Sequence, residues 1–382
     1  MSLPRPSPVA QEHSARVATH IRQAVEAAGG WIDFARYMEL ALYAPGLGYY
    51  MAGARKLGVE GDFVTAPEMS GLFGETLAAQ VAQILRSAGD EVLEVGAGSG
   101  ALAAALLAEL ERRDALPARY LILELSPELR RRSRDTLAAR LPHLMERIAW
   151  LNQLPPAFSG CVLGNEVLDA MPVALLCRAR GAVQERGVAL SGEAFAWEER
   201  ALSDPLRAEV DPAWLSSEGY CSEIGLHARA FVRTLGATLR RGVALFIDYG
   251  FPRHEYYHPQ RAHGTLRCHY RHHAHDDPFF LPGLQDITSH IDFTAIAAAG
   301  QSSGLELLGY ASQAQFLINC GITEQLGRTP AEQPGTYLPL AAQVQKLTSP
   351  AEMGELFKVI ALGRNVPDAL LGFRSGDKRA AL

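Results

Sequence analysis

Residues Glu91 to Leu110 read EVLEVGAGSGALAAALLAEL, a short apolar run followed by alternating glycines and then by a helical pattern. The run Val92 to Val95 has the length of a buried strand, and Leu102, Leu106 and Leu110 recur at helical spacing. Glycines at the end of a strand allow a tight turn and the close approach of a ligand to the backbone. This stretch therefore predicts a strand, a ligand-binding turn and a helix.

The alternation of strands and helices continues on both sides of the turn. Ser70 is placed to cap a helix before it, and Ser126-Pro127 is placed to begin a helix after the next strand. Because strands that alternate with helices pair in parallel, the pattern predicts an α/β fold with a seven-stranded Rossmann-like sheet. The candidate strands are Val92–Val95, Tyr120–Leu123, Ile148–Leu151, Cys161–Gly164, Val243–Ile247, Leu305–Leu308 and Phe357–Leu362.

Two long intervals interrupt this alternation and suggest how the chain is divided. We expect an N-terminal helical segment with a covering loop over residues 1–70, and a Rossmann-like domain over residues 71–382. The domain would carry insertions at about 173–215 and 251–300. The first insertion has the pattern of a β-meander with turns at Gly181, Gly187 and Gly192, and the second is polar and rich in proline and histidine. Loops of this length are usually functional.

The composition argues against several classes of protein. The 382 residues carry a net charge of −6, which gives no positive surface for nucleic acid. The apolar stretches are shorter than the ~18 residues that a membrane span requires. The N-terminus lacks the apolar core of a secretory signal, so we expect a bacterial cytoplasmic protein, or a mitochondrial matrix protein if the source is eukaryotic.

The cysteines and histidines show no metal-binding spacing. The five cysteines lie far apart without a CxxC pair, so we expect buried thiols in a reduced compartment. Seven of the twelve histidines lie between His254 and His275, but no HExxH or Cys-His set accompanies them. We therefore predict no metal, and a polar loop that contacts a protein substrate or a subunit interface.

The glycine turn alone leaves the cofactor open. Its spacing satisfies a relaxed dinucleotide fingerprint, and a turn that only packs a helix on a strand is a further alternative. Glu124 ends the second strand, where a carboxylate can accept both ribose hydroxyls. Glycine at every second position, Gly96, Gly98 and Gly100, with Glu94 two residues before them, favours S-adenosylmethionine over NAD.

Several longer motifs carry a resemblance to a known family. They are GYY (Gly48–Tyr50), GDFVTAPE (Gly61–Glu68), LFGE (Leu72–Glu75), EVGAGSG (Glu94–Gly100), LELSPELR (Leu123–Arg130), GNEVLDAMPV (Gly164–Val173), FIDYG (Phe246–Gly250), PGLQDITSHIDF (Pro282–Phe293) and MGELFKV (Met353–Val359). With them the chain resembles the S-adenosylmethionine-dependent methyltransferases that include the mitochondrial assembly factor for respiratory complex I, also known as the mitochondrial dysfunction protein A family. Many members have proline where this chain has Ala97.

The resemblance implies a fold, a cofactor and an activity. The fold would be a seven-stranded methyltransferase sheet with a reversed last strand, and the cofactor S-adenosylmethionine. In mitochondrial members the family implies symmetric dimethylation of an arginine on a complex I subunit. For this chain we therefore expect a protein substrate, with a homodimer compatible with the sequence.

The candidate catalytic residues follow the fourth strand or lie in the second insertion. A guanidinium acceptor needs carboxylates that localise its charge, and Asn165, Glu166 and Asp169 stand at the ligand-binding end of the sheet. Asp169 could equally cap a turn. His290 could accept a proton, although a structural histidine is the commoner case.

The candidate cofactor residues extend beyond the glycine turn. Asp62 and Thr65 lie on a glycine-bounded loop that we expect to fold over the cofactor, unless it only caps a helix. Leu125 adjoins Glu124, and Asn165 is expected to contact the cofactor as well as the acceptor. Two alternatives to protein arginine methylation stay open. The protein could methylate a small molecule or another side chain, or it could be an assembly factor that binds the cofactor without catalysis.

Overall fold

The computed structural model describes residues 3–52 and 65–382, which form two compact units. The central-sheet unit comprises the described residues of 65–168, 230–250 and 293–382. The appended unit comprises residues 3–52, 169–229 and 251–292. The N-terminal segment thus groups with residues of both insertions, and the boundary suggested at residue 70 stays a prediction.

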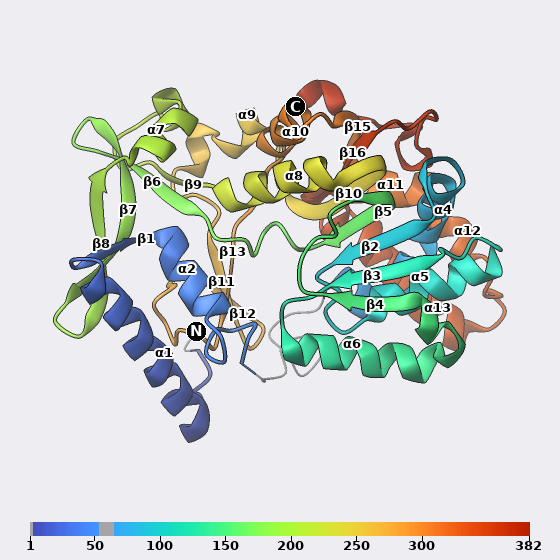
Figure 1. The fold of residues 1–382 in the computed structure, drawn as a ribbon, viewed down its shortest axis with the longest axis horizontal. Helices are drawn as coiled ribbons and strands as arrows, with labels where there is room; N and C mark the ends of the chain where they lie inside the picture. Colours follow the sequence, from blue (N-terminus) through green and yellow to red (C-terminus); the bar gives the residue numbers. More distant parts are fainter. Residues whose placement is uncertain (1–2, 53–64) are drawn as a thin grey trace. The chain divides into compact units, whose positions relative to one another are not determined.

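Seven strands of the central-sheet unit follow one hydrogen-bonded path, in the order β15-β16-β10-β5-β2-β3-β4 (Figure 1). Strands β10, β5, β2, β3 and β4 are parallel neighbours, whereas β16 runs antiparallel to both β10 and β15. The expected α/β sheet with a reversed last strand is confirmed. The strands are β2 (Glu91–Val95), β3 (Arg119–Leu123), β4 (Ile148–Leu151), β5 (Phe158–Asn165), β10 (Leu239–Phe251), β15 (Glu306–Ser312) and β16 (Phe357–Arg364).

The helices of this unit begin where the sequence places their caps. Ser70 Oγ accepts from the Leu72 N–H at the start of α4, and Ser126 Oγ accepts from the Leu129 N–H at the start of α6. The helices are α3 (Ala66–Met69), α4 (Gly71–Ala88), α5 (Ala101–Arg112), α6 (Pro127–Arg140), α10 (Phe293–Ser302), α11 (Gln313–Asn319), α12 (Ile322–Leu326), α13 (Pro334–Thr348) and α14 (Met353–Leu356), and α8 (Leu226–Thr238) spans the division between the units. Short 3-10 turns are η1 (Pro142–Arg147), η4 (Leu371–Phe373) and η5 (Arg379–Ala381).

The appended unit is built from antiparallel strands and two N-terminal helices. The expected meander is present, because β7 pairs with β6 on one side and with β8 on the other. β1 also pairs with β7, β9 pairs with β6, and β11 pairs with both β12 and β13. The elements are α1 (Pro8–Ala27), β1 (Trp31–Asp33), α2 (Phe34–Tyr43), β6 (Ala174–Ala179), β7 (Ala182–Ser191), β8 (Ala194–Ala201), α7 (Asp204–Glu209), η2 (Pro212–Trp214), β9 (Cys221–Ile224), α9 (Arg253–Tyr256), η3 (Pro259–Arg261), β11 (Arg267–Tyr270), β12 (His273–His275), β13 (Asp286–Thr288) and β14 (Ile291–Asp292).

One predicted turn of the meander is wrong. Gly181 and Gly192 adopt φ of +78° and +63° at the hairpin turns, but Gly187 lies inside β7. A Cβ at Gly187 would lie 2.3 Å from the carbonyl oxygen of Ile32 in the neighbouring β1. The glycine therefore marks a close approach of two strands, which in sequence looks the same as a turn.

The expectation of five buried thiols is also wrong. Cys177 and Cys221 form a disulfide, whereas Cys161, Cys268 and Cys320 are free and buried. The pair is 44 residues apart in sequence but directly opposite in the antiparallel pairing of β6 and β9, with a Cα–Cα distance of 4.2 Å. The disulfide removes the cysteine-based argument for a reduced compartment.

Among the helices of residues 3–52 and 65–382, none combines the length and the apolar character that crossing a bilayer demands.

Candidate active site

The glycine turn connects β2 to α5 with three residues in the left-handed region. Gly96, Gly98 and Gly100 have φ of +68°, +54° and +82°, which explains why glycine recurs at every second position. The Gly96 N–H donates to the Leu123 carbonyl at 2.9 Å, which ties the turn to the end of β3. A Cβ at Gly96 would lie 3.1 Å from Val167 Cγ2, so even the smallest side chain there would crowd Val167.

Glu94 lies beneath this turn in β2 and is only 2% exposed. The Tyr120 hydroxyl in β3 donates to Glu94 Oε2 at 2.7 Å. Burial raises the pKa of Glu94, the Tyr120 hydrogen bond lowers it, and the negative charge of Glu124 raises it, which together leave the pKa at about 7. A carboxylate that titrates near neutrality therefore lies at the base of the turn.

Glu124 follows the last residue of β3 and is buried, while its neighbour Leu125 is exposed. Glu124 Oε1 accepts from the Ser126 N–H at 2.8 Å, which orients the carboxylate at the end of the strand. A carboxylate beside an exposed apolar side chain suits a ribose next to an adenine ring. The glycine turn and Glu124 thus fit an adenosine cofactor.

Asn165 ends β5, and Glu166 follows it in an unusual backbone conformation. Glu166 has φ of +52°, a region that residues with a Cβ seldom adopt. Its N–H donates to the Ile247 carbonyl at 2.9 Å, and the Asn165 side-chain amide donates to Glu166 Oε1 at 3.1 Å. Asn165 Oδ1 is buried and finds no hydrogen-bond partner within residues 3–52 and 65–382. The strand end therefore presents an oriented carboxylate and an amide oxygen still able to accept.

Asp248 has a role that the sequence did not show. The side chain, 1% exposed near the end of β10, accepts from the Leu168 N–H at 3.0 Å and from the Tyr249 N–H at 3.0 Å. These bonds hold the segment after Glu166 to the neighbouring strand. Only the pairing of β10 with β5 brings the two segments together, so no local signal in the sequence could reveal it.

The loop expected over the cofactor is described only in part. Asp62 lies outside the described residues, whereas Thr65 immediately precedes α3 and makes no side-chain cap bond to that helix. Glu68 in α3 accepts a hydrogen bond from the Ser99 hydroxyl of the glycine turn. The segment after the loop therefore contacts the turn directly.

Asp169 and His290 belong to the appended unit, whereas Asn165 and Glu166 belong to the central-sheet unit. Asp169 Oδ1 accepts from the Ala170 N–H at 2.9 Å, and its carbonyl accepts from the Ser289 N–H at 3.0 Å. The Tyr50 hydroxyl donates to Asp286 Oδ1 at 2.8 Å. Within this unit, the GYY motif, Asp169 and the segment before His290 are thus brought together.

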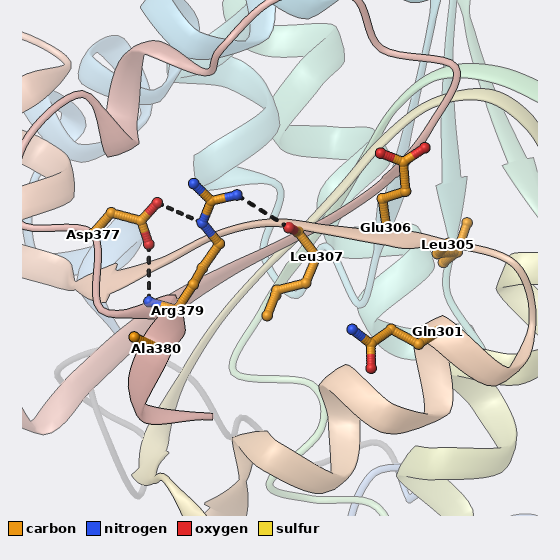
Figure 2. A pocket seen from close by; sticks show the side chains of 7 residues that line it. All are labelled: Gln301, Leu305, Glu306, Leu307, Asp377, Arg379 and Ala380. Atoms are coloured by element: carbon orange, nitrogen blue, oxygen red, sulfur yellow. Dashed lines mark hydrogen bonds and ion pairs between the residues drawn. The ribbon is translucent and has the colours of Figure 1, made fainter.

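A surface pocket of the central-sheet unit lies elsewhere and contains none of the predicted site residues. Figure 2 shows Arg379 between Asp377 and Leu307, with Nε 2.6 Å from Asp377 Oδ2 and Nη1 3.3 Å from the Leu307 carbonyl. The lining residues are Gln301, Leu305, Glu306, Leu307, Asp377, Arg379 and Ala380. In the described part of the chain no three histidine, cysteine, aspartate or glutamate side chains gather to hold a metal ion.

The sheet, the glycine turn and the carboxylate after β3 define a Rossmann-like methyltransferase, whose last strand β16 is reversed between β10 and β15. The chain belongs to the family described as "Putative S-adenosyl-L-methionine-dependent methyltransferase", whose model matches residues 76–311. The protein is an S-adenosylmethionine-dependent methyltransferase, and the dinucleotide alternative is set aside.

Similar proteins support the same class. A "likely methyl transferase" from Burkholderia thailandensis, bound to S-adenosyl-homocysteine in its crystal structure, is 51% identical with a TM-score of 0.96, and the alignment covers 100% of both chains. The "Protein arginine methyltransferase NDUFAF7 homolog, mitochondrial" of Drosophila melanogaster is 29% identical over 94% of this chain and 87% of its own length. The mouse "Protein arginine methyltransferase NDUFAF7, mitochondrial" is 27% identical over 87% of this chain and 81% of its own length.

Proposed function

We propose that the protein methylates the guanidinium of an arginine in a protein substrate. The names of the Drosophila and mouse relatives support this acceptor, and the observation that carries the proposal is the Asn165–Glu166 pair at the end of β5. S-adenosylmethionine supplies, when bound, a methyl group on a sulfonium. The remaining task of the protein is to position the acceptor and stabilise its charge.

The cofactor residues of this proposal surround the turn. The turn backbone would take the methionine end, Glu124 the ribose hydroxyls and Leu125 the adenine face, while Asn165 Oδ1 supplies an acceptor near the reacting end. The full set is Glu94, Gly96, Gly98, Gly100, Glu124, Leu125, Asp62, Thr65 and Asn165.

Glu166 is proposed to bind the acceptor guanidinium. This group stays protonated in solution, and a carboxylate that accepts two of its N–H bonds concentrates the positive charge there. The remaining nitrogen then has more electron density for attack on the methyl group. The amide of Asn165 donates to one Glu166 oxygen, which orients the carboxylate at the end of β5.

Asp169 and His290 are proposed on the acceptor side. Asp169 follows Glu166 by three residues, so the chain alone keeps their Cα atoms within ~11 Å. The Ser289 N–H bond to the Asp169 carbonyl keeps the segment of His290 beside Asp169. His290 would take the proton that the nitrogen loses after transfer, since an imidazole titrates near neutrality.

The test uses methyl-labelled S-adenosylmethionine and an extract of cells that lack the protein. A labelled protein band that yields symmetric dimethylarginine supports the proposal, and a band identified as a subunit of the respiratory NADH dehydrogenase supports the finer substrate. Label in small molecules or in another side chain supports the first alternative. Absence of label despite measured cofactor binding supports the non-catalytic assembly factor, and Gly98→Val and Glu124→Ala serve as cofactor-site controls.

A single substitution tests the role of Glu166. Glu166→Gln keeps the shape but loses the charge, so we expect turnover to fall by about 100-fold while affinity for S-adenosyl-homocysteine changes little. Glu111→Gln is the matched control, because that carboxylate lies near the far end of α5 and pairs with His143. Normal turnover of Glu166→Gln would remove Glu166 from the mechanism.

A further inference from the structure

One serine hydroxyl connects three elements around the glycine turn. Ser99 lies between Gly98 and Gly100 and is 6% exposed. Its hydroxyl donates to Glu68 in α3, and its oxygen accepts from the Ala101 N–H at the start of α5, at 3.3 Å. The hydroxyl therefore donates toward α3 and accepts from α5.

The turn depends on such an anchor because its own backbone is permissive. Three of its five residues are glycines with positive φ, and glycine moves between backbone regions at little cost. Within GAGSG, from Gly96 to Gly100, Ser99 alone carries a polar side chain. Its bond to Glu68 thus ties this peptide segment to a side chain outside the turn.

We propose that Glu68 is a positioning residue for the cofactor turn. By accepting from the Ser99 hydroxyl, it holds the turn in the conformation that binds S-adenosylmethionine. The inference rests on the methyltransferase class and is independent of the identity of the acceptor. Because coupling between two sites is reciprocal, cofactor binding also stabilises residues 66–70.

A purely structural role for Glu68 makes different predictions. Glu68 lies in the first turn of a short helix, where a carboxylate also interacts favourably with the helix dipole. In that case Glu68→Ala would lower the melting temperature of the cofactor-free protein, and its effect would not depend on Ser99. A positioning role instead requires that the effects on cofactor affinity depend on both residues.

The decisive experiment is a double-mutant cycle on the dissociation constant of S-adenosyl-homocysteine, measured by calorimetry on the full chain. Glu68→Ala and Ser99→Ala should each raise the dissociation constant by about three- to tenfold. The dissociation constant of the double variant should be no larger than the larger of the two single-variant values. Glu68→Gln retains an acceptor oxygen and should recover most of the affinity. Glu111→Ala, which removes a carboxylate from the far end of α5, should bind as the parent does.

Amide hydrogen exchange gives the second readout and covers the case in which Glu68→Ala folds poorly. S-adenosyl-homocysteine should slow exchange at residues 66–70 in the parent and in Glu68→Gln, but not in Ser99→Ala. The proposal is overturned if the effects of the two substitutions on the dissociation constant multiply in the double variant, or if neither substitution changes it. It is also overturned if S-adenosyl-homocysteine protects residues 66–70 as well in Ser99→Ala as in the parent. Since no acceptor is used, loss of the arginine assignment would leave these results unaffected.

Discussion

The Tyr120 hydroxyl donates a 2.7 Å hydrogen bond to Glu94, and both side chains are almost fully buried in adjacent parallel strands. Tyr120 is paired with Val92, two residues before Glu94, so its long side chain reaches diagonally along the sheet toward the glycine turn. The bond favours the ionised carboxylate, whereas burial and the charge of Glu124 favour the protonated form. Burial dominates this balance, and the acid is left close to half-ionised at neutral pH.

Glu94→Gln should change how stability depends on pH. The pKa of Glu94 is raised from 4.5 in the unfolded chain to about 7 in the folded one, so its contribution is fully present below pH 4.5 and is lost as pH rises through 7. The shift corresponds to about 3 kcal/mol, and glutamine has no such dependence. Melting temperatures of both proteins from pH 5 to 8 should show the parent losing stability relative to the variant. A constant difference would contradict this account.

Tyr120→Phe should extend the same pH dependence to higher pH. Removing the hydroxyl removes the hydrogen bond that lowers the pKa of Glu94, so the carboxyl stays protonated to a higher pH. The fall in melting temperature should therefore continue to a pH above the one at which it levels off in the parent. Tyr37→Phe is the control, because that buried hydroxyl donates to the Pro278 carbonyl instead of to a carboxylate. It should cost about 1 kcal/mol without moving the pH profile.

The parts of the molecule that local sequence could predict are those set by periodicity and turn chemistry. The run Val92 to Val95, the glycines after it and the caps Ser70 and Ser126 each depend on residues within a few positions. Their strands and helices appear where expected, because backbone conformation at these places is decided by local sterics and hydrogen bonds.

Contacts between distant residues could not be predicted in this way. Glu68 and Ser99 are 31 residues apart, Tyr120 and Glu94 are 26 apart, and Cys177 and Cys221 are 44 apart. Each pair depends on strand register or on helix packing, neither of which a single sequence specifies. Gly187 shows the same limit, since a glycine required by a neighbouring strand resembles one required by a turn.

Glu166→Gly should separate stability from activity. Glu166 adopts φ of +52°, which costs a residue with a Cβ about 1 kcal/mol and costs glycine almost nothing. We expect the variant to be as stable as the parent or more so, while methyl transfer is lost with the carboxylate. Asp114→Gly is the matched control, because Asp114 has φ of +51° two residues after α5, at the end of that helix opposite the glycine turn. Asp114→Gly should gain similar stability and keep full activity. If Glu166→Gly were also active, the strained backbone at Glu166 would serve only the fold.

The Cys177–Cys221 disulfide predicts a specific labelling pattern. In denaturant without a reductant, a thiol-alkylating reagent should add three groups, on Cys161, Cys268 and Cys320, and after reduction it should add five. Intact-mass spectrometry distinguishes these outcomes directly. Five additions before reduction would show that the pair is reduced in the isolated protein.

Replacing both bonded cysteines should destabilise the appended unit. The bond joins residues 44 positions apart, and closing a loop of that size stabilises the folded state by roughly 3–4 kcal/mol in the chain-entropy model. Cys177→Ala combined with Cys221→Ala should therefore lower the melting temperature under oxidising conditions, and a reductant should have no further effect on the variant. Cys268→Ala is the control for losing a buried thiol in the same unit, and its response to the reductant should match that of the parent. If the reductant lowers the melting temperature of the double variant as much as that of the parent, the stabilisation comes from somewhere other than this bond.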